Sequence, residues 1–180
     1  RERMNMKHST NRHFAILVVS VCLAGCGRAA PVAESPPTAK IDAAAYVLPA
    51  EPAGAQTVIP VRESAQDQDE VAVVGRIGGS ANPWVDGRAS FSIVDPALEA
   101  CSDRPDDHCP QPWDYCCETD RLAKAKALVK VVDGQGRLLA ADARELFALK
   151  ELQTVVVQGK AQRDDAGNLT VLASGIYVRP

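Results

Sequence analysis

Stretches of alternating apolar and polar residues divide the second half of the chain into short elements. Alternation with a period of two places every second side chain on one face, so each such stretch predicts a half-buried β-strand. Between the third and fourth stretches, residues 142–149 have helical spacing instead, with Leu146 and Leu149 on one face and Asp142 as a candidate N-cap. The predicted strands are residues 71–77, 89–94, 128–132, 154–160 and 169–178.

The order of these elements predicts a mainly β domain at residues 70–180. Three strands, a helix between strands three and four, and a final two-strand hairpin resemble the OB-fold, a small five-stranded barrel. The resemblance rests on element order, and another small β-barrel or a β-sandwich would give a similar pattern. The alternation slips between Val171 and Leu172, which predicts a bulge in the last strand.

The N-terminal residues have the features of an export signal. Basic residues precede an apolar run at 14–23, which is too short to span a bilayer, and the run ends in Leu-Ala-Gly-Cys at residues 23–26. This ending resembles the lipobox of bacterial lipoproteins, in which the cysteine thiol is acylated and the chain is cut just before it. The resemblance implies a signal peptide at 1–25 and lipidation of Cys26, with an uncleaved core helix as the alternative.

A lipid anchor at Cys26 would place the rest of the chain in the cell envelope, on the extracytoplasmic (periplasmic) side of a membrane. Gly27 follows the cysteine where inner-membrane lipoproteins often have Asp, which favours the outer membrane. The next segment contains six prolines and little large apolar surface. Such a composition predicts a disordered linker over 26–69, although residues 58–61 have the composition of an extra strand.

A polar loop between the second and third strands carries four cysteines, Cys101, Cys109, Cys116 and Cys117. An even number of thiols in an oxidising compartment predicts two disulfides, because cross-links stabilise a loop that has little core of its own. We expect Cys101 and Cys109 to bond to Cys116 and Cys117, in an order that the sequence leaves open.

A metal site is the alternative reading of this cysteine-rich loop. The four thiols and His108 are ligands that suit zinc or copper(I), and a thiol-redox pair is a further alternative. The spacing does not match the paired C-x-x-C pattern of structural zinc sites. His108 has its own simpler interpretation as a solvated loop residue.

Aromatic and basic residues around the predicted barrel are candidate ligand contacts. Trp113 and Tyr115 lie in the cysteine loop and can stack on a ring ligand. Alternatively, Trp113 packs over the disulfides as a small satellite core. In OB-folds the second and third strands and the neighbouring loops form the usual binding surface. By this resemblance Arg76, Trp84 and Arg88 are further candidates.

The charge argues against a nucleic-acid partner. The chain has a net charge of −3, and without residues 1–25 it keeps 16 basic and 22 acidic residues, a balance poorly suited to phosphate backbones. No phosphate loop, nucleophile elbow or paired histidines point to an enzyme. The sequence therefore predicts an envelope lipoprotein whose barrel is a binding or structural module for an unidentified protein or ligand, with no cofactor. The alternative is a zinc, copper or thiol-redox lipoprotein.

Overall fold

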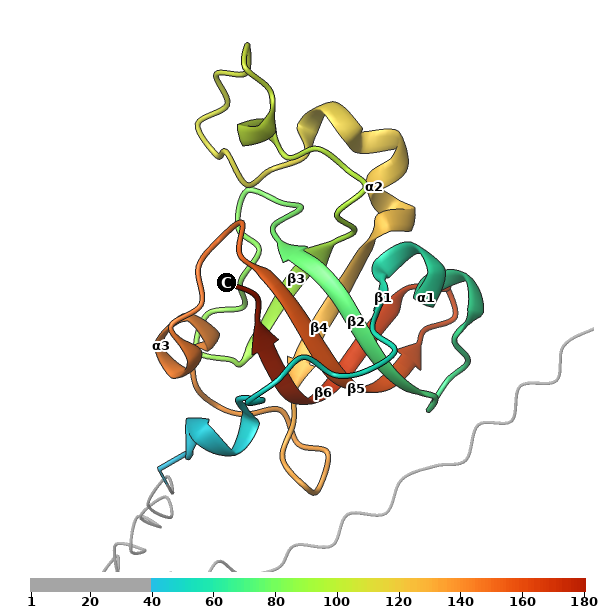
Figure 1. The fold of residues 1–180 in the computed structure, drawn as a ribbon, viewed down its shortest axis with the longest axis vertical. Helices are drawn as coiled ribbons and strands as arrows, with labels where there is room; N and C mark the ends of the chain where they lie inside the picture. Colours follow the sequence, from blue (N-terminus) through green and yellow to red (C-terminus); the bar gives the residue numbers. More distant parts are fainter. Residues whose placement is uncertain (1–39) are drawn as a thin grey trace, which may run out of the picture. The chain divides into compact units, whose positions relative to one another are not determined.

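Five strands close into a barrel (Figure 1). Their alternating apolar residues line its interior. The computed structural model describes residues 40–180, so the predicted signal peptide and the acceptor Cys26 lie outside the described residues. No helix within 40–180 combines the length and the apolar character that a membrane crossing requires. The barrel strands are β2 (Glu70–Ile77), β3 (Ser90–Val94), β4 (Lys126–Val131), β5 (Thr154–Arg163) and β6 (Leu169–Val178).

The strands follow the order β2-β3-β4-β6-β5, and β5 pairs back with β2 to close the barrel. The β4–β6 pair is parallel, whereas the other four barrel pairs are antiparallel. Closure pairs the edges that an open sheet would leave free for other chains. The prediction of a mainly β domain is confirmed in this form: a closed five-stranded barrel with one extra short strand, β1 (Gln56–Thr57), parallel to β2.

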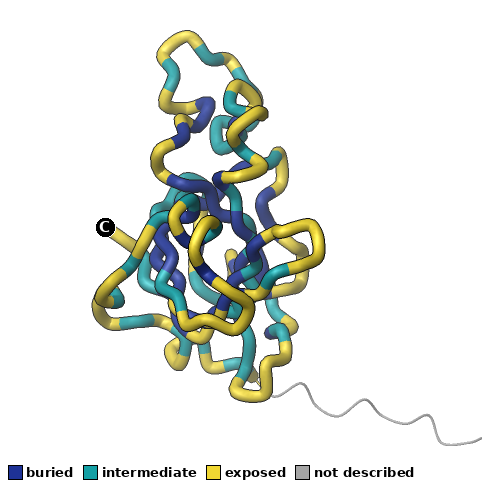
Figure 2. The backbone as a smooth tube through the Cα atoms, turned by 90° about the vertical axis from the view of Figure 1, so that its right-hand side faces the viewer, coloured by how far each residue is buried: buried dark blue, intermediate teal, exposed yellow. Residues whose placement is uncertain are grey.

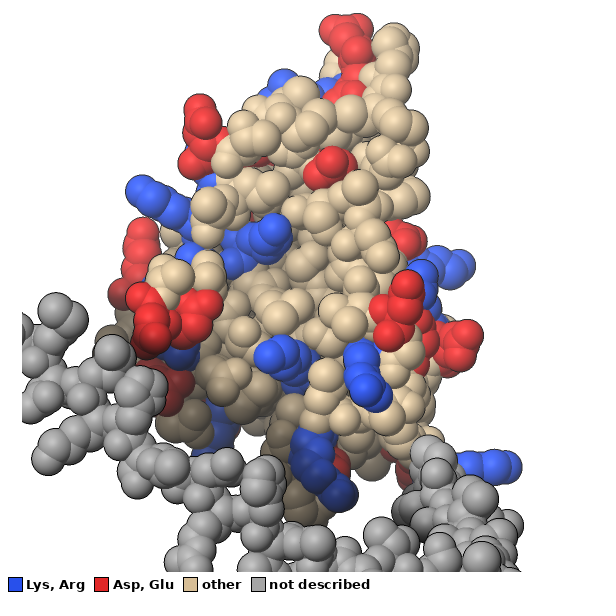
Figure 3. Space-filling view, turned by 180° about the vertical axis from the view of Figure 1, so that it is seen from behind, with Lys and Arg blue, Asp and Glu red and all other residues tan. Residues whose placement is uncertain are grey.

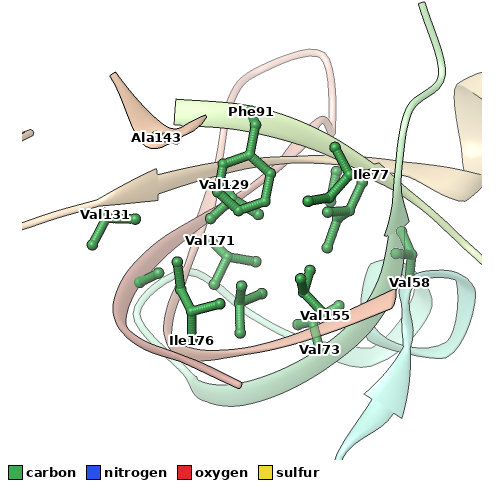
Figure 4. Close-up of a cluster of buried hydrophobic side chains, with 14 of the residues drawn as sticks. Val58, Val73, Ile77, Phe91, Val129, Val131, Ala143, Val155, Val171 and Ile176 are labelled. Atoms are coloured by element: carbon green, nitrogen blue, oxygen red, sulfur yellow. The ribbon is translucent and has the colours of Figure 1, made fainter. Parts of the chain in front are cut away.

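Branched aliphatic side chains fill the barrel, as expected from a sequence with few aromatics. Val73, Phe91, Val129 and Val155 come from four different strands, and none of them is exposed to solvent (Figure 4). Because β-branched residues suit a pleated surface, this composition supports strand formation as well as core packing.

The last strand contains a bulge, at a different residue from the one predicted. The β5–β6 register shifts between Gln158 and Gly159, which leaves Ser174 without a partner opposite β5. The sequence placed the slip between Val171 and Leu172, but burial still alternates there. A Cβ at Gly159 would overlap the carbonyl oxygen of Leu172, so glycine permits this close strand approach.

Helix α3 (Ala143–Phe147) lies between β4 and β5 and is shorter than the predicted 142–149. The Asp142 side chain accepts a hydrogen bond from the backbone N–H of Arg144, which caps the first turn. The helix ends at Ala148, which adopts the left-handed region at φ 53°. Ala143 is buried against the barrel core, and Leu146 and Phe147 pack beside it.

Residues 40–69 differ from the prediction, because they pack on the barrel instead of forming a linker. They form η1 (Ala43–Tyr46), β1 and α1 (Val58–Ser64). Residues 58–61, predicted as a possible extra strand, are helical. Pro60 is compatible with this helix because it lies in the first turn, where its missing N–H costs no helical hydrogen bond. Val58 is fully buried and joins the barrel core. The high alanine and proline content predicted a disordered linker, but a few valines supply enough apolar surface for the segment to pack on the barrel.

Candidate metal centre

Residues 95–125 connect β3 to β4 and project from one end of the barrel (Figure 1, Figure 2). This cysteine insert contains η2 (Cys101–Asp103), η3 (Cys116–Glu118) and α2 (Thr119–Ala125), and the sequence had not predicted the helix α2. Figure 3 shows acidic side chains at its outer end. Tyr115 is fully buried at the base of the insert, in a small second core with Leu98 and Ala125. The predicted satellite core of Trp113 over two disulfides is therefore wrong: the small core of the insert is built on Tyr115 and contains no disulfide.

A glycine pair at the end of β2 receives the insert. The backbone N–H of Gly79 donates to the carbonyl oxygen of Trp113 at 3.1 Å, and the Trp113 indole Nε1 donates to the carbonyl of Ala81 at 3.1 Å. A Cβ at Gly78 would lie 2.5 Å from the same Trp113 oxygen, so only glycine allows this approach. The bottom of the insert is thereby fixed to the barrel.

An ion pair supplies a second attachment. The Arg76 guanidinium, from β2, donates to both carboxylate oxygens of Asp103, at 2.5 and 3.1 Å. This bidentate pair lowers the pKa of Asp103, and the Asp103 carboxylate also accepts from the backbone N–H of Ala100. Arg76, which the sequence suggested as a ligand contact, therefore binds the insert instead.

The sulfurs of Cys101 and Cys109 both lie close to the sulfur of Cys116. Its Sγ lies 3.2 Å from the Sγ of Cys109 and 3.5 Å from that of Cys101. The fourth sulfur, on Cys117, is 3.9 Å from the Cys116 sulfur. A disulfide requires about 2.0 Å between sulfurs, so the two predicted disulfides are not formed and all four described cysteines are free thiols.

A carboxylate completes the group around these sulfurs. Asp107 offers an oxygen that lies, with the sulfurs of Cys101, Cys109 and Cys116, in a set whose ligand atoms are all within 4.8 Å of one another. Its Oδ1 accepts from the backbone N–H of Cys109 at 2.7 Å, whereas its Oδ2 is buried and has no hydrogen-bond partner. An unpartnered buried carboxylate oxygen is costly unless a donor or a cation meets it. Three sulfurs and one oxygen are therefore close enough to one another to hold a cation.

The electrostatics single out Cys116 as the sulfur that ionises first. Contacts from the thiols of Cys109 and Cys101 favour its thiolate and lower the pKa of Cys116. The same Cys116 contact raises the pKa of Cys109, while burial raises the pKa of Cys101. The backbone N–H of Cys109 keeps the pKa of Asp107 below its usual value. Cys116 is thus the thiol that loses its proton most readily, and a bound cation would displace the protons of the other two thiols as well.

The structure separates the five ligands that the alternative reading proposed. Cys101, Cys109 and Cys116 belong to the set of close ligand atoms, but His108 and Cys117 do not. Both line an open pocket of about 480 Å³ beside the set, and both are exposed. Asp107 is the ligand that sequence reasoning missed; the Asp-x-Cys spacing, which lets an aspartate accept from the cysteine N–H, is the local signal for it.

The remaining candidate residues do not form a shared exposed surface. Trp84 is buried in the barrel core, where its Nε1 donates to Glu151 at 2.6 Å and the Arg144 guanidinium lies over its ring. Trp113 and Arg76 hold the insert, as described above, and Arg88 is exposed on a separate loop. Trp84 and Tyr115 are therefore closed to a ligand by burial, whereas Trp113 stays partly exposed.

Sequence comparison adds no family to this description. No protein-family model matches the chain, and a search of curated proteins found no match either. The chemistry of the cysteine insert is therefore argued from its own residues.

Proposed function

We propose that the chain is an exported, lipid-anchored protein whose barrel is a rigid scaffold for a zinc site in the cysteine insert. Cys101, Cys109 and Cys116 supply thiolates, and Asp107 supplies a carboxylate oxygen. The carrying observation is the meeting of these four ligand atoms within 4.8 Å, at sulfur separations too long for disulfides. A tetrahedral zinc ion with Zn–S bonds of about 2.3 Å needs its sulfurs about 3.8 Å apart, so small shifts would admit the ion.

Zinc fits this donor set better than copper(I). Zinc accepts sulfur and oxygen ligands together in a tetrahedron, whereas copper(I) selects soft thiolate and thioether ligands. Copper(I) would use the three sulfurs and leave the buried Oδ2 of Asp107 without a partner. The carboxylate therefore distinguishes the two metals.

The barrel positions the cysteine insert but supplies none of the proposed metal ligands. Arg76 from β2 and the glycine pair after it hold the insert at two points. Together with α3 between β4 and β5, the strand order supports our proposal of an OB-fold-like scaffold. No enzymatic step is proposed, because the insert brings together metal ligands without a distinct acid–base pair.

The lipidation proposal concerns residues outside the described range and rests on the sequence alone. Anchoring at Cys26 would leave the domain on the periplasmic side, with the outer membrane as the favoured one. A zinc site with thiolate ligands in that compartment must compete with oxidation. A bound zinc ion would protect the sulfurs from oxidation, because their electron pairs would be engaged in Zn–S bonds.

Metal analysis together with thiol counting tests the proposal. The full chain, purified with and without added zinc, should retain one zinc ion after gel filtration, and Cys109→Ser should lose it. Ser102→Ala, an exposed neighbour of the site, is the matched control and should keep the ion. If the unmodified chain retained no metal and all four cysteines resisted alkylation until reduced, the insert would be a disulfide-stapled scaffold instead.

A further inference from the structure

The four sulfurs of the insert differ systematically in their access to solvent. Cys101 is 2% exposed, Cys109 is half-buried, and Cys116 and Cys117 are exposed. Cys117 lies outside the set of four close ligand atoms, yet its sulfur is 3.9 Å from that of Cys116. One thiol is therefore left over at the surface, within reach of a ligand that belongs to the site.

The open pocket gives the leftover thiol access to an incoming molecule. It has a volume of about 480 Å³, and Asp107, Cys109, Cys116 and Cys117 all line it, so three of the four ligands of the site and the extra thiol border the same space. The carboxylates of Glu99, Asp106 and Asp107 also border it, against the single guanidinium of Arg104, and this excess of negative charge favours the approach of a cation. The buried Cys101 is not among the lining residues, so an ion that enters here reaches the exposed sulfurs first.

We propose that Cys117 is an exchange ligand, through which the zinc ion passes between the site and a small thiol-bearing metal carrier that enters the pocket. This inference rests on the proposed zinc site. A resident ligand holds the ion at equilibrium, whereas an exchange ligand binds it only during transfer. Cys116 joins the two steps, because its sulfur contacts Cys117 on one side and Cys101 and Cys109 on the other.

The transfer is a ligand substitution without redox change. The Cys117 sulfur forms a bond to a zinc ion held by a carrier thiolate, the zinc–carrier sulfur bond breaks, and the Cys117 proton moves to the departing carrier thiolate. In the following substitutions the sulfurs of Cys116, Cys109 and Cys101 bind the ion in turn, each displacing a remaining carrier ligand, a bound water or the Cys117 sulfur, and each thiol proton passes to the displaced thiolate or to solvent. Zinc stays divalent throughout, and each bond formed replaces one that is broken.

Transfer kinetics test the inference, with zinc–glutathione as donor and a coloured zinc chelator as acceptor. Cys117→Ser should still bind one zinc ion with nearly unchanged affinity, but should load and release it several-fold more slowly than the unmodified chain. His108→Ala, on the same pocket wall, is the control and should keep the unmodified rates.

The outcomes separate the inference from the function on which it rests. Equal transfer rates for Cys117→Ser and the unmodified chain would overturn the exchange role and leave the zinc site intact. Loss of the bound ion in Cys117→Ser would also overturn it, by making Cys117 a resident ligand. Absence of zinc from the unmodified chain would instead contradict the proposed function itself.

Discussion

The backbone of Gly78 lies so close to the carbonyl of Trp113 that a Cβ there would be 2.5 Å from the oxygen. This contact joins the end of β2 to the cysteine insert, two segments that are far apart in the sequence. The neighbouring Gly79 N–H donates to the same oxygen, so the contact fixes the position of Trp113 relative to the end of β2. We therefore expect the geometry of the sulfurs to depend on this attachment.

Gly78→Ala should disturb the zinc site from the barrel side. The added methyl group must push Trp113 away from the barrel, which lowers the unfolding free energy by about 1–3 kcal/mol and weakens zinc binding. Gly134→Ala is the control, since a Cβ at Gly134 meets nothing within 4 Å. Thermal unfolding and zinc titration of both variants measure the effect. Unchanged zinc affinity in Gly78→Ala would show that the insert holds its geometry without the barrel.

Asp107→Asn tests the carboxylate as a metal ligand. Asparagine keeps an oxygen that can accept from the Cys109 N–H, so the loop conformation is preserved while the negative charge is removed. We expect zinc affinity to fall by at least about 10-fold, because changes that only touch the outer shell of a metal site already cost roughly 10–100-fold. Asp106→Asn changes an exposed neighbour and should bind zinc like the unmodified chain. Competition with a chelator of known affinity gives both values, and equal affinities would remove Asp107 from the site.

Val58→Ala tests whether the segment before residue 70 belongs to the domain. Val58 is fully buried in the barrel core, and the loss of two methyl groups should cost about 2 kcal/mol of unfolding free energy. Val85→Ala removes the same atoms from a side chain that is 43% exposed, and should cost little. Urea unfolding of both variants gives the comparison. A linker at 26–69 would make the two variants equally stable.

Asp142→Ala should shorten or unravel α3. Loss of the N-cap costs about 1 kcal/mol, whereas Asp165→Ala, in an exposed turn, should be nearly neutral. The Arg144 guanidinium keeps the pKa of Asp142 well below its usual value. A carboxyl whose folded pKa is lowered stabilises the fold above its unfolded pKa, near 4, and this contribution disappears as the pH falls through the folded pKa. The melting-temperature gap between wild type and Asp142→Ala should therefore narrow below about pH 4, and a gap that widened there would contradict this assignment.

Local periodicity was enough to predict the barrel strands. Each predicted strand overlaps an observed one, because one face of every strand is buried and the period of two survives in the sequence. Helix α2 has too few buried residues to leave a helical pattern, with only Ala125 buried. The docking of 40–69 depends on isolated valines and on contacts with distant residues, such as the buried Asp95, whose carboxylate accepts from the Ile59 N–H at 2.7 Å.

The candidate site was predictable in its residue types but not in its geometry. The sequence indicated that the four cysteines act together, yet their number alone favoured disulfides over a cluster of free thiols. Which sulfurs meet is decided by the fold of the insert, through contacts such as Arg76 with Asp103. Trp84 and Tyr115 were candidates for ligand contact, but both side chains are buried in the two hydrophobic cores.

X-ray absorption at the zinc edge of the zinc-loaded full chain tests the central claim most directly, because it counts the atoms bound to the ion. Coordination by Cys101, Cys109, Cys116 and Asp107 predicts three sulfur neighbours at about 2.3 Å and one oxygen at about 2.0 Å. A first shell of oxygen and nitrogen alone, or a chain that takes up no zinc while its thiols are reduced, would contradict the account.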